Sequence, residues 1–293
     1  MHRTEQPPAA VAIATCAAVA GVEKDDLQLI EALQRRGIKA VHAVWDDPEV
    51  DWQSFALVVI RSTWDYTERR GEFLAWASQL RRVSNPLPIL RWNTDKHYLD
   101  DLARAGLPII PTRFLEPEDV FEPPSLPFVV KPAVSCGSKN AARYHGSDGV
   151  QARDHVRRLQ AKGRSVLIQP YLADIEVKGE VALMFMGGAY SHSICRDALL
   201  KWPALPDQGL ALPLNVRAYQ ATLEERSLAE RVMAHISGDS ADLLYGRVDL
   251  VPGPKGEPMI LEVELTEPSL FLQFSRNGVE RLAGCIANAL ADS

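Results

Sequence analysis

The chain of 293 residues is 46% hydrophobic, 24% charged and 7% aromatic, a composition typical of a globular protein with about two domains. Its net charge of −6 and pI near 5.7 provide no basic surface for nucleic acid or an anionic membrane, so neither is an expected partner. An apolar run at residues 9–22 is too short to span a bilayer and continues into a helical pattern, so we expect no export signal. The cysteines at positions 16, 136, 195 and 285 are too scattered to form a metal motif, and we expect free thiols in a reducing, cytoplasmic compartment.

The first ninety or so residues alternate short apolar strands with helices, which is typical of a parallel α/β unit. The pattern predicts strands at residues 11–15, 39–44, 56–60 and 89–92, and helices at residues 26–36 and 72–82. A polar and aromatic segment follows the third strand, where ligands bind in open α/β sheets. The candidate substrate-contacting residues are therefore Arg61, Ser62, Thr63, Trp64, Asp65 and Tyr66. The alternative is a capped loop whose tryptophan packs on the next helix.

The middle of the chain contains a helix, a strand that ends in a lysine, and a loop of small residues. The helix is predicted from about residue 93 to residue 106. A proline-rich stretch leads into the apolar strand 128–132, which carries Lys131, and the small polar loop 133–140 follows at once. A helix at 150–162 and a strand at 166–169 complete this part. The composition of the loop predicts that it is mobile.

The last part of the chain is predicted to be an antiparallel sheet with covering helices. A Gly-Gly turn joins strands 181–186 and 189–194, and helices are expected at 224–236 and 278–291. A second hairpin carries acids: Glu262 and Glu264 alternate with apolar residues and so share one face, and Asp249 can lie across from them. Three converging carboxylates are costly unless a cation holds them, and oxygen ligands favour Mg²⁺ or Mn²⁺. The alternative is a solvated strand face.

The order of these features resembles the ATP-grasp superfamily of carboxylate-amine ligases over roughly residues 93–272. The resemblance implies an α/β chain with the ATP-grasp fold, in which an N-terminal parallel α/β domain precedes an α+β C-terminal part. It implies a substrate-side domain at residues 1–92 and a small subdomain with a phosphate lid at 93–168. A C-terminal subdomain with the metal site would then cover residues 169–293.

The resemblance also assigns nucleotide-binding residues. Phosphate contacts fall on Lys96 and Lys131, and a closing loop over the phosphates falls on residues 135–140, with Ser135, Gly137, Ser138 and Lys139. Gln169 matches the residue that faces the adenine amino group, while Tyr171 and Leu172 match the hinge and its apolar wall. Glu176 is assigned to the ribose hydroxyls, with Asp174 and Glu180 as alternatives.

The metal ligands of the family fall on Asp249, Glu262 and Glu264, the last standing where the family often has asparagine. Arg196 and Arg247 match the cations that hold the γ-phosphate or the developing acyl phosphate; structural pairing is their alternative role. The resemblance thus implies binding of ATP with Mg²⁺, or with Mn²⁺. Independently of it, a site for ATP must supply several cations and exclude water, and the chain offers residues for both tasks.

The function implied is ATP-dependent ligation: a small amino-acid-like carboxylate is phosphorylated, and an amine displaces phosphate to form an amide. Segments 61–66, 91–96 and 261–271 are similar to the glutathione-synthetase-like branch of the superfamily. That branch includes a cyclo-ligase that forms the antibiotic cycloserine from O-ureidoserine, in which the amine and the carboxylate belong to one molecule. A small-molecule kinase and a non-catalytic nucleotide-binding subunit are the alternatives, and a homodimer stays open.

Overall fold

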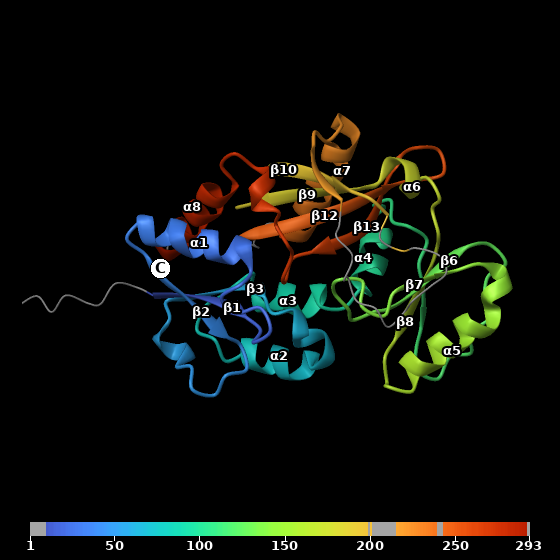
Figure 1. Cartoon of the computed structure of the whole chain (residues 1–293), viewed down its shortest axis with the longest axis horizontal. Coiled ribbons are helices and arrows are strands. Elements are labelled where there is room, and N and C mark those ends of the chain that lie inside the picture. The colour runs from blue at the N-terminus through green and yellow to red at the C-terminus, as the bar shows by residue number, and fades with distance from the viewer. Residues whose placement is uncertain (1–9, 199, 201–214, 239–242, 292–293) are drawn as a thin grey trace, which may run out of the picture.

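The computed structural model describes residues 10–198, 200, 215–238 and 243–291. Within these ranges the chain forms three β-sheets. The N-terminal sheet and the middle sheet lie at opposite ends of the molecule (Figure 1). The third sheet joins them. None of the helices in the described ranges is long and apolar enough to cross a membrane.

The N-terminal sheet is parallel, as predicted, with strand order β2-β1-β3-β4. Its strands are β1 (Ala10–Thr15), β2 (Lys39–Val44), β3 (Leu57–Ser62) and β4 (Val83–Ser84), and its long helices are α1 (Lys24–Arg35) and α2 (Arg70–Ala77). Residues 11–14 of β1 are fully buried because both faces of the sheet are covered. One face of the sheet shares a core with α1 and with residues of the C-terminal part, including Met184.

Two expectations for the next segment are wrong. Residues 89–92 form part of helix α3 (Leu87–Asn93) instead of a strand, with a proline in its first turn. A short, mostly apolar segment of this length fits either structure, and proline in the first turn favours the helix. The single helix predicted at 93–106 is also divided, since α3 ends at Asn93 and α4 (Tyr98–Arg104) begins after a break. Lys96 lies in that break.

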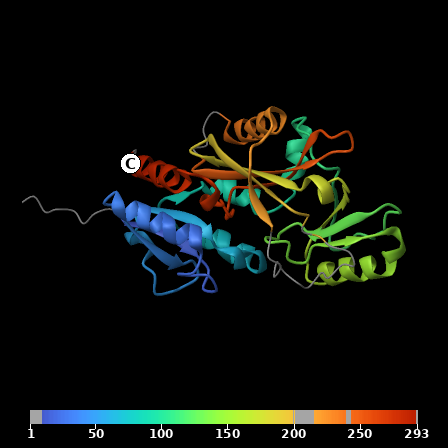
Figure 2. The same cartoon turned by 45° about the horizontal axis from the view of Figure 1, so that its top comes forward.

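The middle sheet is antiparallel, with strand order β5-β8-β6-β7. It contains β5 (Arg113–Leu115), β6 (Phe128–Pro132), β7 (Ala142–Tyr144) and β8 (Val166–Pro170), and helix α5 (Gly149–Gln160) covers one face (Figure 2). The predicted strand before the small-residue loop and the predicted helix after it are confirmed. Lys131 sits near the end of β6, and the loop follows it directly.

The C-terminal sheet has the order β11-β10-β9-β12-β13, and both predicted hairpins are present in it. The strands are β9 (Glu180–Met186), β10 (Ala189–Arg196), β11 (Val216–Tyr219), β12 (Tyr245–Pro252) and β13 (Pro258–Glu264), accompanied by α6 (Ile175–Lys178), α7 (Leu223–Ser237) and α8 (Gly278–Ala291). Alternate residues of β9 face opposite sides: Leu183 packs into a core with α4 and α7, and Met184 into a core with α1, α8 and the N-terminal sheet. Because this second core joins the two ends of the chain, the division at residues 93 and 169 stays a prediction.

Candidate active site

A cavity of about 510 Å³ lies where the middle sheet, the C-terminal sheet and the segment around Trp64 meet. Its lining includes most of the residues expected to bind a nucleotide: Lys96, Lys131, Ser135, Gly137, Ser138, Gln169, Tyr171 and Leu172. Apolar side chains such as Val129 and Leu261 form part of its wall. Segments that are far apart in the sequence therefore converge on one cavity.

Two buried lysines converge on one acid of the cavity. The Lys96 Nζ lies 2.8 Å from the Glu262 Oε1, and the Lys131 Nζ lies 3.9 Å from the Glu262 Oε2. Burial of Glu262 opposes its ionisation, but the two lysines outweigh this effect and lower its pKa to about 2. Lys96 also donates to the Ser135 carbonyl oxygen at 2.7 Å, which ties it to the start of the small-residue loop.

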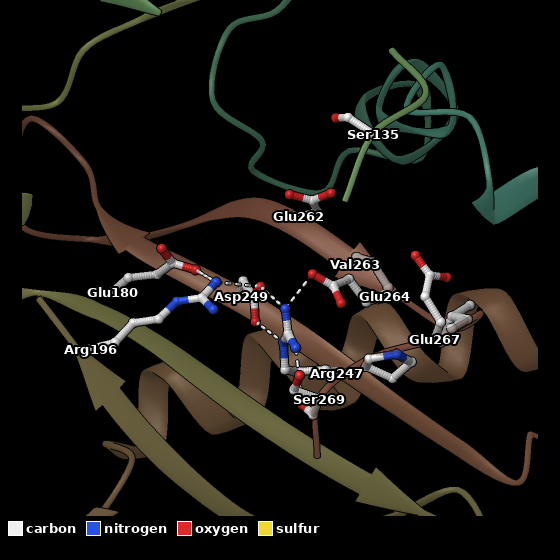
Figure 3. Close-up of polar contacts among 12 residues, drawn as sticks. Ser135, Glu180, Arg196, Arg247, Asp249, Glu262, Val263, Glu264, Glu267 and Ser269 are labelled. Carbon is white, nitrogen blue, oxygen red and sulfur yellow. Dashed lines mark hydrogen bonds and ion pairs between the residues drawn. The ribbon is translucent and has the colours of Figure 1, made fainter. Parts of the chain in front are cut away.

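Beside the lysines, two buried arginines and three acids form a continuous chain of ion pairs (Figure 3). Arg247 contacts both oxygens of Asp249, at 2.8 and 2.9 Å, and also pairs with Glu264, its cross-strand neighbour on β13. Arg196 pairs with Glu180 and lies 3.1 Å from the Asp249 Oδ2. Burial alone would lower the pKa of Arg247, but Asp249 and Glu264 outweigh it and raise that pKa, so the guanidinium stays charged.

The three acids expected to bind metal do not form one ligand set. Asp249 is fully buried and gives its oxygens to Arg247 and Arg196, and among the described residues no three potential ligands are placed to share a metal ion. Glu262 and Glu264 both line the cavity, with side chains 21% and 25% exposed. Burial raises the pKa of Glu264 to about 7 despite the contact with Arg247. These two carboxylates fit a hard divalent cation, whereas Asp249 serves to hold the arginines.

Of the three candidates for the ribose hydroxyls, the residue assigned to that role does not line the cavity. Glu176 lies on the short helix α6, outside the cavity lining, where it pairs with Arg143 and accepts from the Tyr171 hydroxyl at 3.0 Å. Asp174 pairs with Lys178. Glu180, at the start of β9, is the candidate that lines the cavity. Spacing along the chain could not show which way the turn of α6 directs each acid.

Lys139 also lies away from the expected position. Its Nζ is 2.8 Å from the Glu68 Oε1, and it does not line the cavity. The loop before it rests on the N-terminal part of the chain, since the Cys136 thiol donates to the Trp64 carbonyl oxygen at 3.2 Å. Residues 137 and 138 have φ of 58° and 57°, the left-handed region that glycine adopts readily and serine seldom does. The predicted role of this loop as a mobile lid stays a prediction.

Of the six residues predicted to contact the substrate, Trp64 alone lines the cavity. Arg61 is 3% exposed: its Nε lies 3.2 Å from the Asp26 Oδ1, and its Nη1 donates to the Pro268 carbonyl oxygen at 3.0 Å. The buried acid of α1 holds the guanidinium of Arg61, so the structure does not direct it toward the cavity, and its predicted contact with a substrate carboxylate stays a prediction. The remaining four point into the fold or to other partners: Ser62 to Asp26, Asp65 to Trp45 and Arg69, and Thr63 and Tyr66 into buried positions.

The structure adds a residue that the sequence analysis did not single out. Glu267 lines the cavity just beyond the end of β13 and is 6% exposed. Burial is the main cause that raises its pKa to about 8, and the nearby Glu264 adds to the shift. In the sequence, Glu267 is the third glutamate of one acidic segment. It lies after the end of β13, so the alternation of side chains along a strand does not predict which way it points.

Together these groups suit a reaction that handles a polyphosphate. The cavity brings two lysines and two arginines together with carboxylates able to hold a divalent cation. Preorganised cations of this kind stabilise charge that develops on a transferring phosphoryl group. The apolar wall and the adjoining loop provide a surface that can keep water from a reactive intermediate.

Comparison with known proteins agrees with this chemistry. Residues 11–87 match the family model described as the N-terminal domain of D-cycloserine synthetase DcsG. The cycloserine biosynthesis protein DcsG of Streptomyces lavendulae is 40% identical over 96% of this chain and 98% of its own length. A crystal structure of D-cycloserine synthetase DcsG has a TM-score of 0.88 at 38% identity, covering 96% of this chain and 99% of the other. The D-alanine–D-alanine ligase of Bacillus anthracis, in complex with ATP, has a TM-score of 0.65 at 13% identity, covering 97% and 98%.

Proposed function

The chain belongs to the D-cycloserine synthetase family of ATP-grasp ligases, and we propose that it uses ATP to close O-ureidoserine into the cycloserine ring. The predicted ATP-grasp fold and carbon–nitrogen ligase activity agree with that family. The observation that carries the proposal is the convergence of Lys96, Lys131, Arg196 and Arg247 on one cavity. Such a set neutralises a triphosphate and a reacting carboxylate at the same time.

In the first step, a carboxylate oxygen of the substrate attacks the γ-phosphorus of ATP, and ADP leaves. Both reactants are anions, so their approach depends on the cations of the cavity. Lys96 and Lys131 are placed at the loop that begins with Ser135, which supports their role at the phosphates. Asp249 contacts both Arg247 and Arg196 and fixes their guanidinium groups. This supports a role for the two arginines in binding the γ-phosphate and the acyl phosphate formed from it.

In the second step, the ureido nitrogen bonded to oxygen attacks the carbonyl carbon of the acyl phosphate of the same molecule, and phosphate leaves as the five-membered ring closes. Water then removes the carbamoyl group from that nitrogen as carbamate, which decomposes to carbon dioxide and ammonia, and cycloserine is released. The oxyanion that forms during ring closure is stabilised by the same fixed cations. The reacting nitrogen and the carboxylate belong to one molecule, so the cavity needs to bind a single substrate in a bent conformation and does not need to align two substrates. The loop at residues 133–140 and Trp64 would together limit the access of water to the acyl phosphate.

A divalent cation would fit beside the phosphates. Glu262 and Glu264 would hold it, because both offer hard carboxylate oxygens to the cavity. When bound, Mg²⁺ would supply further neutralisation of the phosphate oxygens. Glu262 would then exchange part of its contact with Lys96, leaving that lysine free to meet phosphate.

The proposal is tested by ADP release with O-ureidoserine and with other amino-acid-like carboxylates, tested singly and in pairs. Ligation predicts ADP release with O-ureidoserine alone, together with inorganic phosphate and cycloserine. A kinase would accumulate a stable phosphorylated product without inorganic phosphate. A non-catalytic binding subunit would bind ATP and release no ADP with any compound.

A further inference from the structure

Glu267 differs from the other acids of the cavity in its lack of a cationic partner. Glu180 pairs with Arg196, Glu262 with Lys96, and Glu264 with Arg247. Among the described residues, no basic group lies within ion-pair distance of Glu267, and Figure 3 shows it beside the chain of ion pairs without a link to it. A buried carboxylate without a counter-ion is costly. The fold therefore carries in the cavity wall a carboxyl group that no cation of the described residues pairs with, and a cationic ligand group would favour its ionised form.

The position of Glu267 is fixed from several sides. The Tyr66 hydroxyl lies close enough to its carboxylate to lower the pKa of Glu267, and the Trp64 Nε1 donates to the Glu267 backbone carbonyl oxygen at 3.1 Å. The next residue, Pro268, accepts from Arg61 at 3.0 Å. The buried pair of Arg61 and Asp26 thus holds the backbone that carries the acid, which gives this pair a positioning role.

We propose that Glu267 receives the α-ammonium group of the amino-acid substrate, an inference that rests on the function proposed above. An amino acid enters as a zwitterion, and the cavity offers each charge a different wall. Its carboxylate is drawn to Arg196 and Arg247, and its ammonium group to the acid that the protein leaves without a cation. Trp64, whose indole is anchored to the Glu267 backbone, forms the wall next to this subsite. The cavity is then selective for α-amino acids over simple carboxylates.

The test compares two ligands that differ only in this amine. O-ureidoserine and its deamino analogue, ureidooxypropanoate, are titrated by calorimetry into the protein in the presence of a non-hydrolysable ATP analogue. The variants are Glu267→Gln and, as a matched control, Glu72→Gln, which makes the same chemical change on an exposed side chain of α2. Glutamine is an isostere of the protonated acid, so the cavity variant is expected to fold, and its melting temperature verifies this.

The wild type and Glu72→Gln should bind the amine-bearing ligand about tenfold or more tightly than the analogue. Glu267→Gln should lose that preference while its affinity for the nucleotide analogue stays unchanged. A preference that persists in Glu267→Gln overturns the subsite, and so does a wild type that shows no preference. Cycloserine formation by the wild type is measured separately, so failure of the subsite and failure of the proposed function give different results.

Discussion

Arg247 and Asp249 lie two residues apart on β12 and meet in a bidentate contact, with Nε 2.8 Å from Oδ1 and Nη2 2.9 Å from Oδ2. The period of two along a strand places both side chains on one face of the sheet. Arg247 also donates to the Ser269 carbonyl oxygen at 2.9 Å. The guanidinium is therefore oriented before any ligand arrives, and Asp249 acts as its support.

Arg247→Lys should lower turnover by about 100-fold, the loss typical for removal of one fixed electrostatic donor. Lysine keeps the charge but cannot reproduce the planar fork that meets Asp249 and Glu264 together. Steady-state kinetics at saturating ATP measures the effect, and Arg226→Lys, on an exposed ion pair of α7, is the control. Near-normal turnover in Arg247→Lys would show that only the charge matters.

Lys131→Met should raise the KM for ATP by about tenfold or more while the melting temperature without nucleotide hardly changes. Burial lowers the pKa of Lys131, so the folded protein gains little from its charge until phosphate is present. Lys139→Met, which removes a pair with Glu68 outside the cavity, should have a smaller effect on KM. A loss of stability without a change in KM would assign Lys131 a structural role.

Glu267 should make the fold less stable as the pH rises. Burial raises its pKa from 4.5 to about 8, so between these values the folded protein keeps a proton that the unfolded chain has released. The free energy of unfolding then falls with rising pH by about 1.4 kcal/mol per unit for one proton. Glu264 contributes in the same direction up to its own pKa of about 7.

The comparison of wild type with Glu267→Gln isolates this contribution. Glutamine cannot ionise, so the variant should melt at a higher temperature than the wild type at pH 8.5, and the difference should shrink at pH 5.5. Thermal unfolding at the two pH values, without ligands, provides the measurement. Parallel pH profiles for the two proteins would contradict the raised pKa.

Arg61→Met should destabilise the fold by about 3–5 kcal/mol, because it leaves Asp26 buried without its cation. Chemical denaturation measures the loss, with Arg104→Met on an exposed pair as the control. Restored stability in the double variant Arg61→Met, Asp26→Leu would support the pairing, since two apolar groups replace both charges. An unchanged free energy of unfolding in the single variant would contradict this structural role and leave the predicted substrate contact as the remaining role of Arg61.

Much of this architecture is readable from the sequence because it depends on local pattern. Buried strands such as 128–132 and the glycine turn at residues 187–188 are set by neighbours in the chain. The strand predicted at 89–92 was wrong because a four-residue segment with three apolar residues does not distinguish a strand from a helix turn. The outcome there depends on Pro88 and on packing against other elements.

The site was predictable where a side chain lies near the end of a strand, as Lys131 and Gln169 do. It was not predictable where long-range pairing decides direction. Arg61 also lies near the end of a strand, but Asp26 holds it in the interior. Glu267 was missed because the direction of its side chain depends on the turn after β13 and on Tyr66, which precedes it by 201 residues in the sequence.

The most direct test of the account follows oxygen from the substrate carboxylate. O-ureidoserine labelled with ¹⁸O in both carboxylate oxygens is incubated with the protein, ATP and Mg²⁺, and the phosphate and cycloserine are analysed by mass spectrometry. Activation as an acyl phosphate predicts that each inorganic phosphate carries one ¹⁸O and that the cycloserine carbonyl keeps the other. Cycloserine formed together with unlabelled phosphate would contradict the account, because ATP would then have been cleaved without transfer to the carboxylate.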